Sequence, residues 1–247
     1  TAYGVASENS GGSPFLIFGD ALVPLLQRGR ASQLETILSN ETLAGLGALY
    51  APWQNRASLP ELPPAQARMR FQNDFVTLLK TLAQLSPLVL MLDDLQWADA
   101  AVWDLLDALL PRLAQTPLLL LLAYRRPGIE KNAGWEFLQK WERGGLETLA
   151  LNPLTAADVV QLFDQTDTDE AARVAAFTGG SPFYLSEYLA GQREGRVLER
   201  DPIAARLRGL SESARTALNA AAVLGEQVAF RLWTQVALVS PLALAAS

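Results

Sequence analysis

Three acidic side chains follow a short apolar stretch of the sequence. Residues 88–92 are continuously apolar, Asp93 and Asp94 come directly after them, and Asp99 follows Leu95-Gln96-Trp97-Ala98. Two adjacent carboxylates repel each other, and a bound cation relieves that repulsion; a site built from oxygen atoms suits Mg²⁺. Mg²⁺ in such sites often bridges the phosphates of a nucleotide. The pattern therefore predicts a metal-nucleotide site, with a second carboxylate that orients or deprotonates water.

Two other interpretations of these residues are open. Asp93 and Asp94 could simply end a strand and cap the next helix, since aspartate is common in turns, but the apolar run before them and Trp97-Ala98-Asp99 after them favour a ligand site. An acid/base hydrolase is the weakest alternative, because neighbouring carboxylates do not give the separation of about 5–10 Å that glycoside chemistry needs. Trp97 and Trp103 are expected to pack in the core or on helices.

The elements that must position the acidic residues are predicted to form an α/β unit. A helix is expected from about Ala65 to Leu85, where apolar residues repeat at spacings of three and four. Residues 88–92 and 118–123 are expected to be buried parallel strands, with a helix capped by Asp99 between them. This strand-helix-strand order is a right-handed βαβ unit, and ligands of open α/β sheets bind at the carboxyl ends of the strands.

Composition excludes several classes of function. The chain has 247 residues, half of them apolar, so it can build a sizeable core. It contains no histidine and no cysteine, which excludes Ser-His-Asp catalysis, imidazole or thiolate metal sites and disulfides. The net charge of −6 argues against binding to nucleic acid or to anionic membranes. The longest apolar run, residues 118–124, is too short to span a membrane, and the first residues do not form a signal peptide, so a cytoplasmic location is expected.

Several segments, in order along the chain, resemble one family. LVLMLDDLQWAD resembles the Walker B segment of the STAND class of P-loop ATPases, which are related to AAA+ proteins, and is closest to that of large ATP-binding transcriptional regulators of the LuxR family. Further similarities follow the family's order: SPFLIFGDALVPLL to the segment after the P-loop helix, PLLLLLAYRR to the sensor-1 strand, LNPLTAADVVQLF to the beginning of the helical lid, GGSPFYLSEYL to the GxP motif, and RLRGLSESARTALNAAAVLG to the start of a winged-helix domain. The resemblance covers nearly the whole chain, and the Walker B segment is its most specific part.

The resemblance implies an α/β fold class: a partial P-loop NTPase parallel sheet, followed by an all-helical lid and the start of a winged-helix domain. The implied domains are a truncated P-loop NTPase core over residues 1–127 with Walker B and sensor 1, a lid with the GxP motif over 128–200, and the winged-helix start over 201–247. The DNA-binding helix-turn-helix of the LuxR regulators has no counterpart here, so this chain is not expected to bind nucleic acid directly.

The resemblance also assigns roles to individual residues, with ATP or ADP and Mg²⁺ as cofactors. It implies that Asp93 holds Mg²⁺, largely through water, and that Asp94 is the general base or water-orienting acid. Arg125 would sense the γ-phosphate, and Pro182, in the GxP motif with Gly180, would pack near the adenine. Simpler roles stay open: Arg125 could be a surface arginine, and a proline at a helix start needs no ligand to explain it.

One expected motif is missing from the sequence. It contains no G-x-x-x-x-G-K-[ST], the P-loop that supplies the backbone N–H groups and the lysine for the phosphates. The family places this loop upstream, so we expect a fragment that lacks the P-loop and the first strand and does not hydrolyse ATP well alone.

The leading hypothesis is a regulatory ATP-binding switch in a signal-transduction or transcriptional regulator, which could self-associate or bind a signalling partner. The alternative is a non-catalytic α/β interaction scaffold that does not bind nucleotide in this form.

Overall fold

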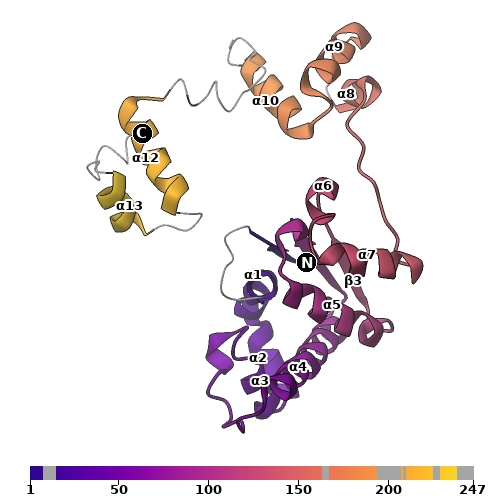
Figure 1. Ribbon diagram of the computed structural model, residues 1–247, viewed down its shortest axis with the longest axis vertical. Coiled ribbons are helices and arrows are strands. Elements are labelled where there is room, and N and C mark those ends of the chain that lie inside the picture. Colours follow the sequence, from indigo (N-terminus) through magenta and orange to yellow (C-terminus); the bar gives the residue numbers. More distant parts are fainter. Residues whose placement is uncertain (8–14, 163–166, 194–206, 208–209, 225–228, 238–247) are drawn as a thin grey trace. The chain divides into compact units, whose positions relative to one another are not determined.

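The computed structural model describes residues 1–7, 15–162, 167–193, 207, 210–224 and 229–237. The chain divides into two compact units, residues 1–148 and 149–247 (Figure 1). Much of the expected winged-helix segment, 201–247, lies outside the described residues.

A three-stranded parallel sheet forms the centre of the first unit. Its strands are β1 (Ala2–Val5), β2 (Leu88–Asp93) and β3 (Leu118–Leu122), in the spatial order β1-β2-β3. Both pairs of neighbours run parallel. The α/β class and the two parallel strands expected near residues 88–92 and 118–123 are therefore confirmed. The expected burial of residues 118–123 is wrong: β3 alternates between half-buried and exposed side chains, and Leu119 and Leu121 are 55% and 43% exposed. Because β2 is the middle strand, its carboxyl end lies between those of its neighbours.

The first strand, β1, was not predicted from the sequence. It has only four residues, and they alternate between buried and exposed. Gly4 lies against the backbone carbonyl of Ile17 with no room for a Cβ, so α1 approaches β1 closely at this point. The register places Tyr3 opposite Met91 and Val5 opposite Asp93. This pairing brings the Tyr3 side chain to the edge where β2 ends.

Helices and short helical turns make up most of the rest of the first unit. They are α1 (Leu16–Leu25), η1 (Leu26–Arg30), α2 (Ala31–Ile37), α3 (Asn40–Gly45), η2 (Ala51–Trp53), α4 (Pro64–Leu85), η3 (Leu95–Trp97), α5 (Ala100–Leu113), α6 (Arg126–Ile129) and α7 (Gly134–Arg143). The long helix α4 confirms the helix expected from about Ala65 to Leu85. The cap of α5 is also confirmed: Asp99 accepts a hydrogen bond from the Val102 N–H at 3.0 Å.

The core of the first unit includes Trp103 of α5, which is fully buried. Its ring lies against Gly134, the first residue of α7, where a Cβ would overlap the indole. Trp141 packs beside it, with ring centroids 6.0 Å apart. Trp103 thus packs as expected, whereas the core position considered for Trp97 is wrong. Trp97 is 46% exposed, because the turn η3 directs it away from the core.

A poorly solvated carboxylate lies between α3 and α4. Asp74 of α4 faces Gly45, and its buried Oδ2 has no hydrogen-bond partner among the described residues. Burial raises the pKa of Asp74, while the charge of Arg70 and a hydrogen bond from Thr42 act in the opposite direction. When the pKa of a carboxyl is higher in the folded than in the unfolded state, that group lowers the stability of the fold as the pH rises from the unfolded-state pKa to the folded-state pKa.

We expect Asp74→Asn to raise the free energy of unfolding at pH 7 by at most about 1 kcal/mol, because it removes a partly buried charge whose Oδ2 has no hydrogen-bond partner among the described residues, while solvent screens part of the penalty. The gain should shrink as the pH falls toward 3.8, the ordinary pKa of aspartate, since the wild-type carboxyl is then increasingly protonated. Urea unfolding of both proteins between pH 3 and pH 7 measures the difference. A gain that does not depend on pH, or a loss of stability at pH 7, would contradict this assignment.

The second unit is helical in the part that the structure describes. Its elements are α8 (Ala156–Leu162), α9 (Thr168–Thr178), α10 (Pro182–Arg193), α12 (Glu212–Leu224) and α13 (Phe230–Ala237). α9 packs against both α8 and α10, and α12 packs against α13 (Figure 1). No described helix combines the length and the apolarity that a membrane crossing requires.

A weak strand pattern between the two units is not borne out. The weak alternation of apolar residues in LETLALNPL, residues 146–154, is typical of a strand, but the structure assigns no strand there. Leu149 and Leu151 are 84% and 87% exposed. A strand requires ladder hydrogen bonds to a neighbour, and no described strand pairs with this segment.

Candidate functional site

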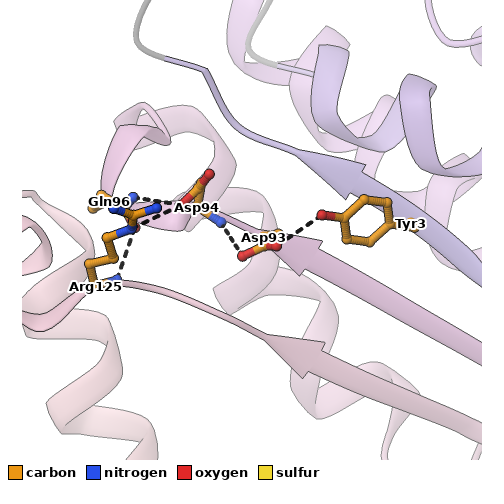
Figure 2. A network of polar contacts seen from close by, with 5 residues as sticks. All are labelled: Tyr3, Asp93, Asp94, Gln96 and Arg125. Atoms are coloured by element: carbon orange, nitrogen blue, oxygen red, sulfur yellow. Dashed lines mark hydrogen bonds and ion pairs between the residues drawn. The ribbon is translucent and has the colours of Figure 1, made fainter. Parts of the chain in front are cut away.

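The predicted acidic pair and the predicted arginine meet at one edge of the sheet. Asp93 is the last residue of β2, Asp94 follows it, and Arg125 comes shortly after β3 (Figure 2). The Arg125 Nε lies 3.6 Å from the Asp94 Oδ1. Because parallel strands end at the same edge, the βαβ unit brings together residues that are far apart in the sequence. The result is a site of two carboxylates and one guanidinium.

Both carboxylate oxygens of Asp93 have protein partners. Oδ1 accepts a hydrogen bond from the Asp94 N–H at 2.7 Å, and Oδ2 accepts one from the Tyr3 hydroxyl at 2.9 Å (Figure 2). The hydrogen bond to Asp93 raises the pKa of Tyr3, and burial and the charges of Asp93 and Asp94 add to the effect. A cation, or water bound to one, would compete with the Tyr3 hydroxyl for the Asp93 Oδ2.

Asp94 has a strained backbone conformation. Its φ of 53° makes it the one residue other than glycine with a positive φ in the described part of the chain. Such a conformation is unfavourable for most side chains and persists where the surroundings enforce it. Here the Gln96 Nε2 donates a hydrogen bond of 2.9 Å to the Asp94 Oδ1. The backbone therefore turns sharply after β2, and the Asp94 carboxylate faces Arg125.

Three residues of this network were missed by sequence reasoning: Tyr3, Gln96 and Asn132. Gln96 is only 7% exposed, and its Oε1 accepts the backbone N–H of Arg125 at 3.0 Å. The Asn132 side chain donates to the carbonyl oxygens of Gln96 and Ala98 at 3.0 and 2.9 Å. The available signal was a lone polar residue between Leu95 and Trp97, which requires hydrogen-bond partners when it is buried.

The donor set fits Mg²⁺ only if other ligands complete it. Among the residues that the structure describes, no three acidic side chains come together as a metal cage. Asp99 is used as the cap of α5 and is not part of the pair, which weakens the hydrolase alternative. Mg²⁺ usually keeps several waters and takes one or two carboxylates plus phosphate oxygens. Asp93 can provide one such carboxylate, and its role as the metal residue stays a prediction.

Gly180 and Pro182 belong to the second unit, where local packing explains their types. Gly179 ends α9 with φ 60°, and Gly180 follows with φ 67°. The Gly180 N–H donates to the Ala175 carbonyl at 3.0 Å, and the Gly180 carbonyl accepts from the Leu154 N–H at 2.8 Å. Pro182 is the first residue of α10, as expected, and is exposed. Their contact with a nucleotide remains a prediction.

A known protein family matches most of the first unit. Residues 1–122 match the family model of the AAA ATPase domain, and the match ends at the last residue of β3. It supports a P-loop ATPase module of the AAA type, and hence a nucleotide-binding regulatory ATPase function, for this part of the chain. No curated protein and no solved structure matches the chain.

Proposed function

We propose that this chain is part of a regulatory ATP-binding switch, a STAND ATPase module in a signal-transduction or transcriptional regulator. In the intact protein Mg²⁺·ATP would bind where β2 and β3 end. The observation that carries the proposal is the convergence of Asp93, Asp94 and Arg125 at this edge. The AAA ATPase domain match over residues 1–122 supports nucleotide binding independently of that geometry.

Each residue has a role that its surroundings allow. Mg²⁺, when bound, neutralises charge on the phosphates. Asp93 would hold the hydrated ion through its Oδ2, once the Tyr3 hydroxyl has released that oxygen. Asp94, whose carboxylate is held by the hydrogen bond from Gln96, would orient or deprotonate water. The Arg125 side chain is 80% exposed and its pairing with Asp94 is long, so it can turn toward a γ-phosphate at little cost.

The phosphate cradle must come from another segment. The sequence contains no P-loop, and none of the residues named in the site described above is a lysine that could hold the phosphates. We propose that sequence upstream of Thr1 supplies the P-loop. The nearby sequence of the gene tests this: a P-loop within a few dozen codons upstream supports the switch, and its absence supports the scaffold alternative. In the scaffold alternative, the hydrogen bonds from the Tyr3 hydroxyl and the Asp94 N–H would be the permanent partners of the Asp93 carboxylate, and no metal ion would bind there.

A switch must also respond to the state of its nucleotide. Residues 146–154 join the two units, and Leu149 and Leu151 are largely exposed, so a protease can reach this segment. In the gene product that includes its upstream sequence, we expect Mg²⁺ with a non-hydrolysable ATP analogue and Mg²⁺·ADP to give different cleavage rates here. Timed proteolysis with mass spectrometry measures these rates.

Asp93→Ala provides the control for that experiment, because it should remove the difference between the two nucleotides without changing the joining segment. A scaffold gives the same cleavage rate with either nucleotide and with none. Identical rates in the wild-type protein would therefore count against the switch. A change in association state or partner binding with ATP would extend the proposal to self-association or a signalling partner.

A further inference from the structure

The buried side-chain amide of Gln96 joins the two halves of the candidate site. Its Nε2 donates to the Asp94 Oδ1 at 2.9 Å, and its Oε1 accepts from the Arg125 backbone N–H at 3.0 Å (Figure 2). Asp94 follows β2 and Arg125 follows β3. One side chain therefore connects the ends of two neighbouring strands, in addition to the ladder between them.

Only one orientation of this amide satisfies both partners. A carboxylate only accepts hydrogen bonds and a backbone N–H only donates them, so the NH₂ group must face Asp94 and the oxygen must face Arg125. Leucine at this position could serve neither partner. Glutamate could still accept from Arg125 but would set a second carboxylate against Asp94. Glutamine thus matches both neighbours, which a generic buried polar residue would not.

The Gln96 side chain is held in place from the side of α6. A Cβ at Gly128 would lie 2.9 Å from the Gln96 Cβ and 3.0 Å from its Cγ, so the glycine is packed directly onto this side chain. Asn132 donates a hydrogen bond of 3.0 Å to the backbone carbonyl oxygen of Gln96. The backbone and the first side-chain carbons of Gln96 are therefore held by contacts beyond the two partners of its amide, as expected of a residue that orients others.

We propose that Gln96 is a positioning residue of this site, which holds the Asp94 carboxylate and the Arg125 backbone in one arrangement so that acid and arginine act as a unit. The inference rests on the proposed function, because it concerns the same nucleotide site. It adds the link that sets the water-orienting acid relative to the phosphate-sensing arginine. A shift of either residue would then be transmitted to the other through the amide.

Amide hydrogen exchange on the 247-residue chain tests the clamp without any nucleotide. In Gln96→Leu the Arg125 amide should exchange roughly tenfold faster, because its acceptor is lost, whereas amides within β3 should be unchanged. In Gln96→Glu, which keeps an oxygen acceptor, the Arg125 amide should stay protected. A merely structural role would instead accelerate exchange throughout β2 and β3, in step with a lowered melting temperature.

Nucleotide affinity gives the second readout, in the gene product that includes the P-loop. Both Gln96→Leu and Gln96→Glu should weaken binding of Mg²⁺ with an ATP analogue by about 10–100-fold, as is typical of outer contacts around a metal ligand. Unchanged exchange at Arg125 in Gln96→Leu, or unchanged affinity in both variants, would overturn the role of Gln96. Absence of binding in the wild-type protein would instead overturn the proposed function, while the exchange result still decides whether the clamp exists.

Discussion

Replacing Trp103 with alanine is expected to lower the free energy of unfolding of the first unit by about 3–5 kcal/mol. The side chain is fully buried and packs between Gly134 and Trp141, so its removal leaves a large cavity that α5 and α7 cannot close without moving. Its indole N–H has no hydrogen-bond partner among the described residues, so the loss is one of packing. Against a typical stability of about 5–15 kcal/mol, this loss leaves little reserve.

Trp97 gives a matched control for this prediction. It lies in the same part of the chain but is 46% exposed, so Trp97→Ala should cost less than about 1 kcal/mol. Denaturant unfolding followed by far-ultraviolet circular dichroism compares the two variants, because this signal does not depend on tryptophan fluorescence. Similar losses in the free energy of unfolding for both substitutions would show that Trp103 does not hold α5 and α7 together as the structure indicates.

Asp93→Ala is expected to reduce Mg²⁺-dependent affinity for an ATP analogue by at least about 100-fold in a gene product that includes the proposed upstream P-loop. Even residues that only support metal ligands contribute about 10–100-fold to affinity, and Asp93 is proposed to hold the ion itself. In the part of the chain that the structure describes, the Asp93 Oδ2 accepts a hydrogen bond from the Tyr3 hydroxyl, which can be displaced. Titration of a fluorescent ATP analogue in the presence of Mg²⁺ measures the change.

Two further variants separate loss of the metal from loss of the fold. Asp93→Asn keeps an oxygen acceptor for the Asp94 N–H but removes the charge, so it should fold normally and still lose most Mg²⁺-dependent affinity. Asp104→Ala removes a half-exposed carboxylate of α5 that lies 3.9 Å from Arg68, and it should leave affinity unchanged. An Asp93→Asn protein that binds as tightly as wild type would exclude a metal role for this carboxylate.

The central elements of the first unit could be predicted because their sequence patterns are long or uniform. The strands β2 and β3 are continuous apolar runs, and α4 repeats its apolar residues over many turns. Strand β1 escaped prediction because four residues with one buried face carry too little pattern. The alternation at Leu149 and Leu151 suggested a strand that is not formed, since alternation alone supplies no partner for the ladder.

The candidate site was predictable to the extent that the βαβ unit determines it. Placing Asp93, Asp94 and Arg125 at one edge requires only that two parallel strands end together. Tyr3 and Gln96 depend on tertiary approach instead: Tyr3 reaches Asp93 across the β1–β2 pair, and Gln96 reaches Arg125 after a turn with a positive φ at Asp94. The lone polar residue between Leu95 and Trp97 indicates that Gln96 needs partners if it is buried, but no local pattern in the sequence identifies those partners.

The most direct test of the central claim, a Mg²⁺-nucleotide site at Asp93 and Asp94, is equilibrium titration of a fluorescent ATP analogue with Mg²⁺ and with EDTA. A gene product that includes the proposed upstream P-loop should bind the analogue in Mg²⁺, lose most affinity in EDTA, and lose the Mg²⁺ dependence in Asp93→Ala. The 247-residue chain, which contains no P-loop, should bind weakly at most and should not hydrolyse ATP. Efficient hydrolysis by this chain alone, or Mg²⁺-dependent binding that survives Asp93→Ala, would contradict the account.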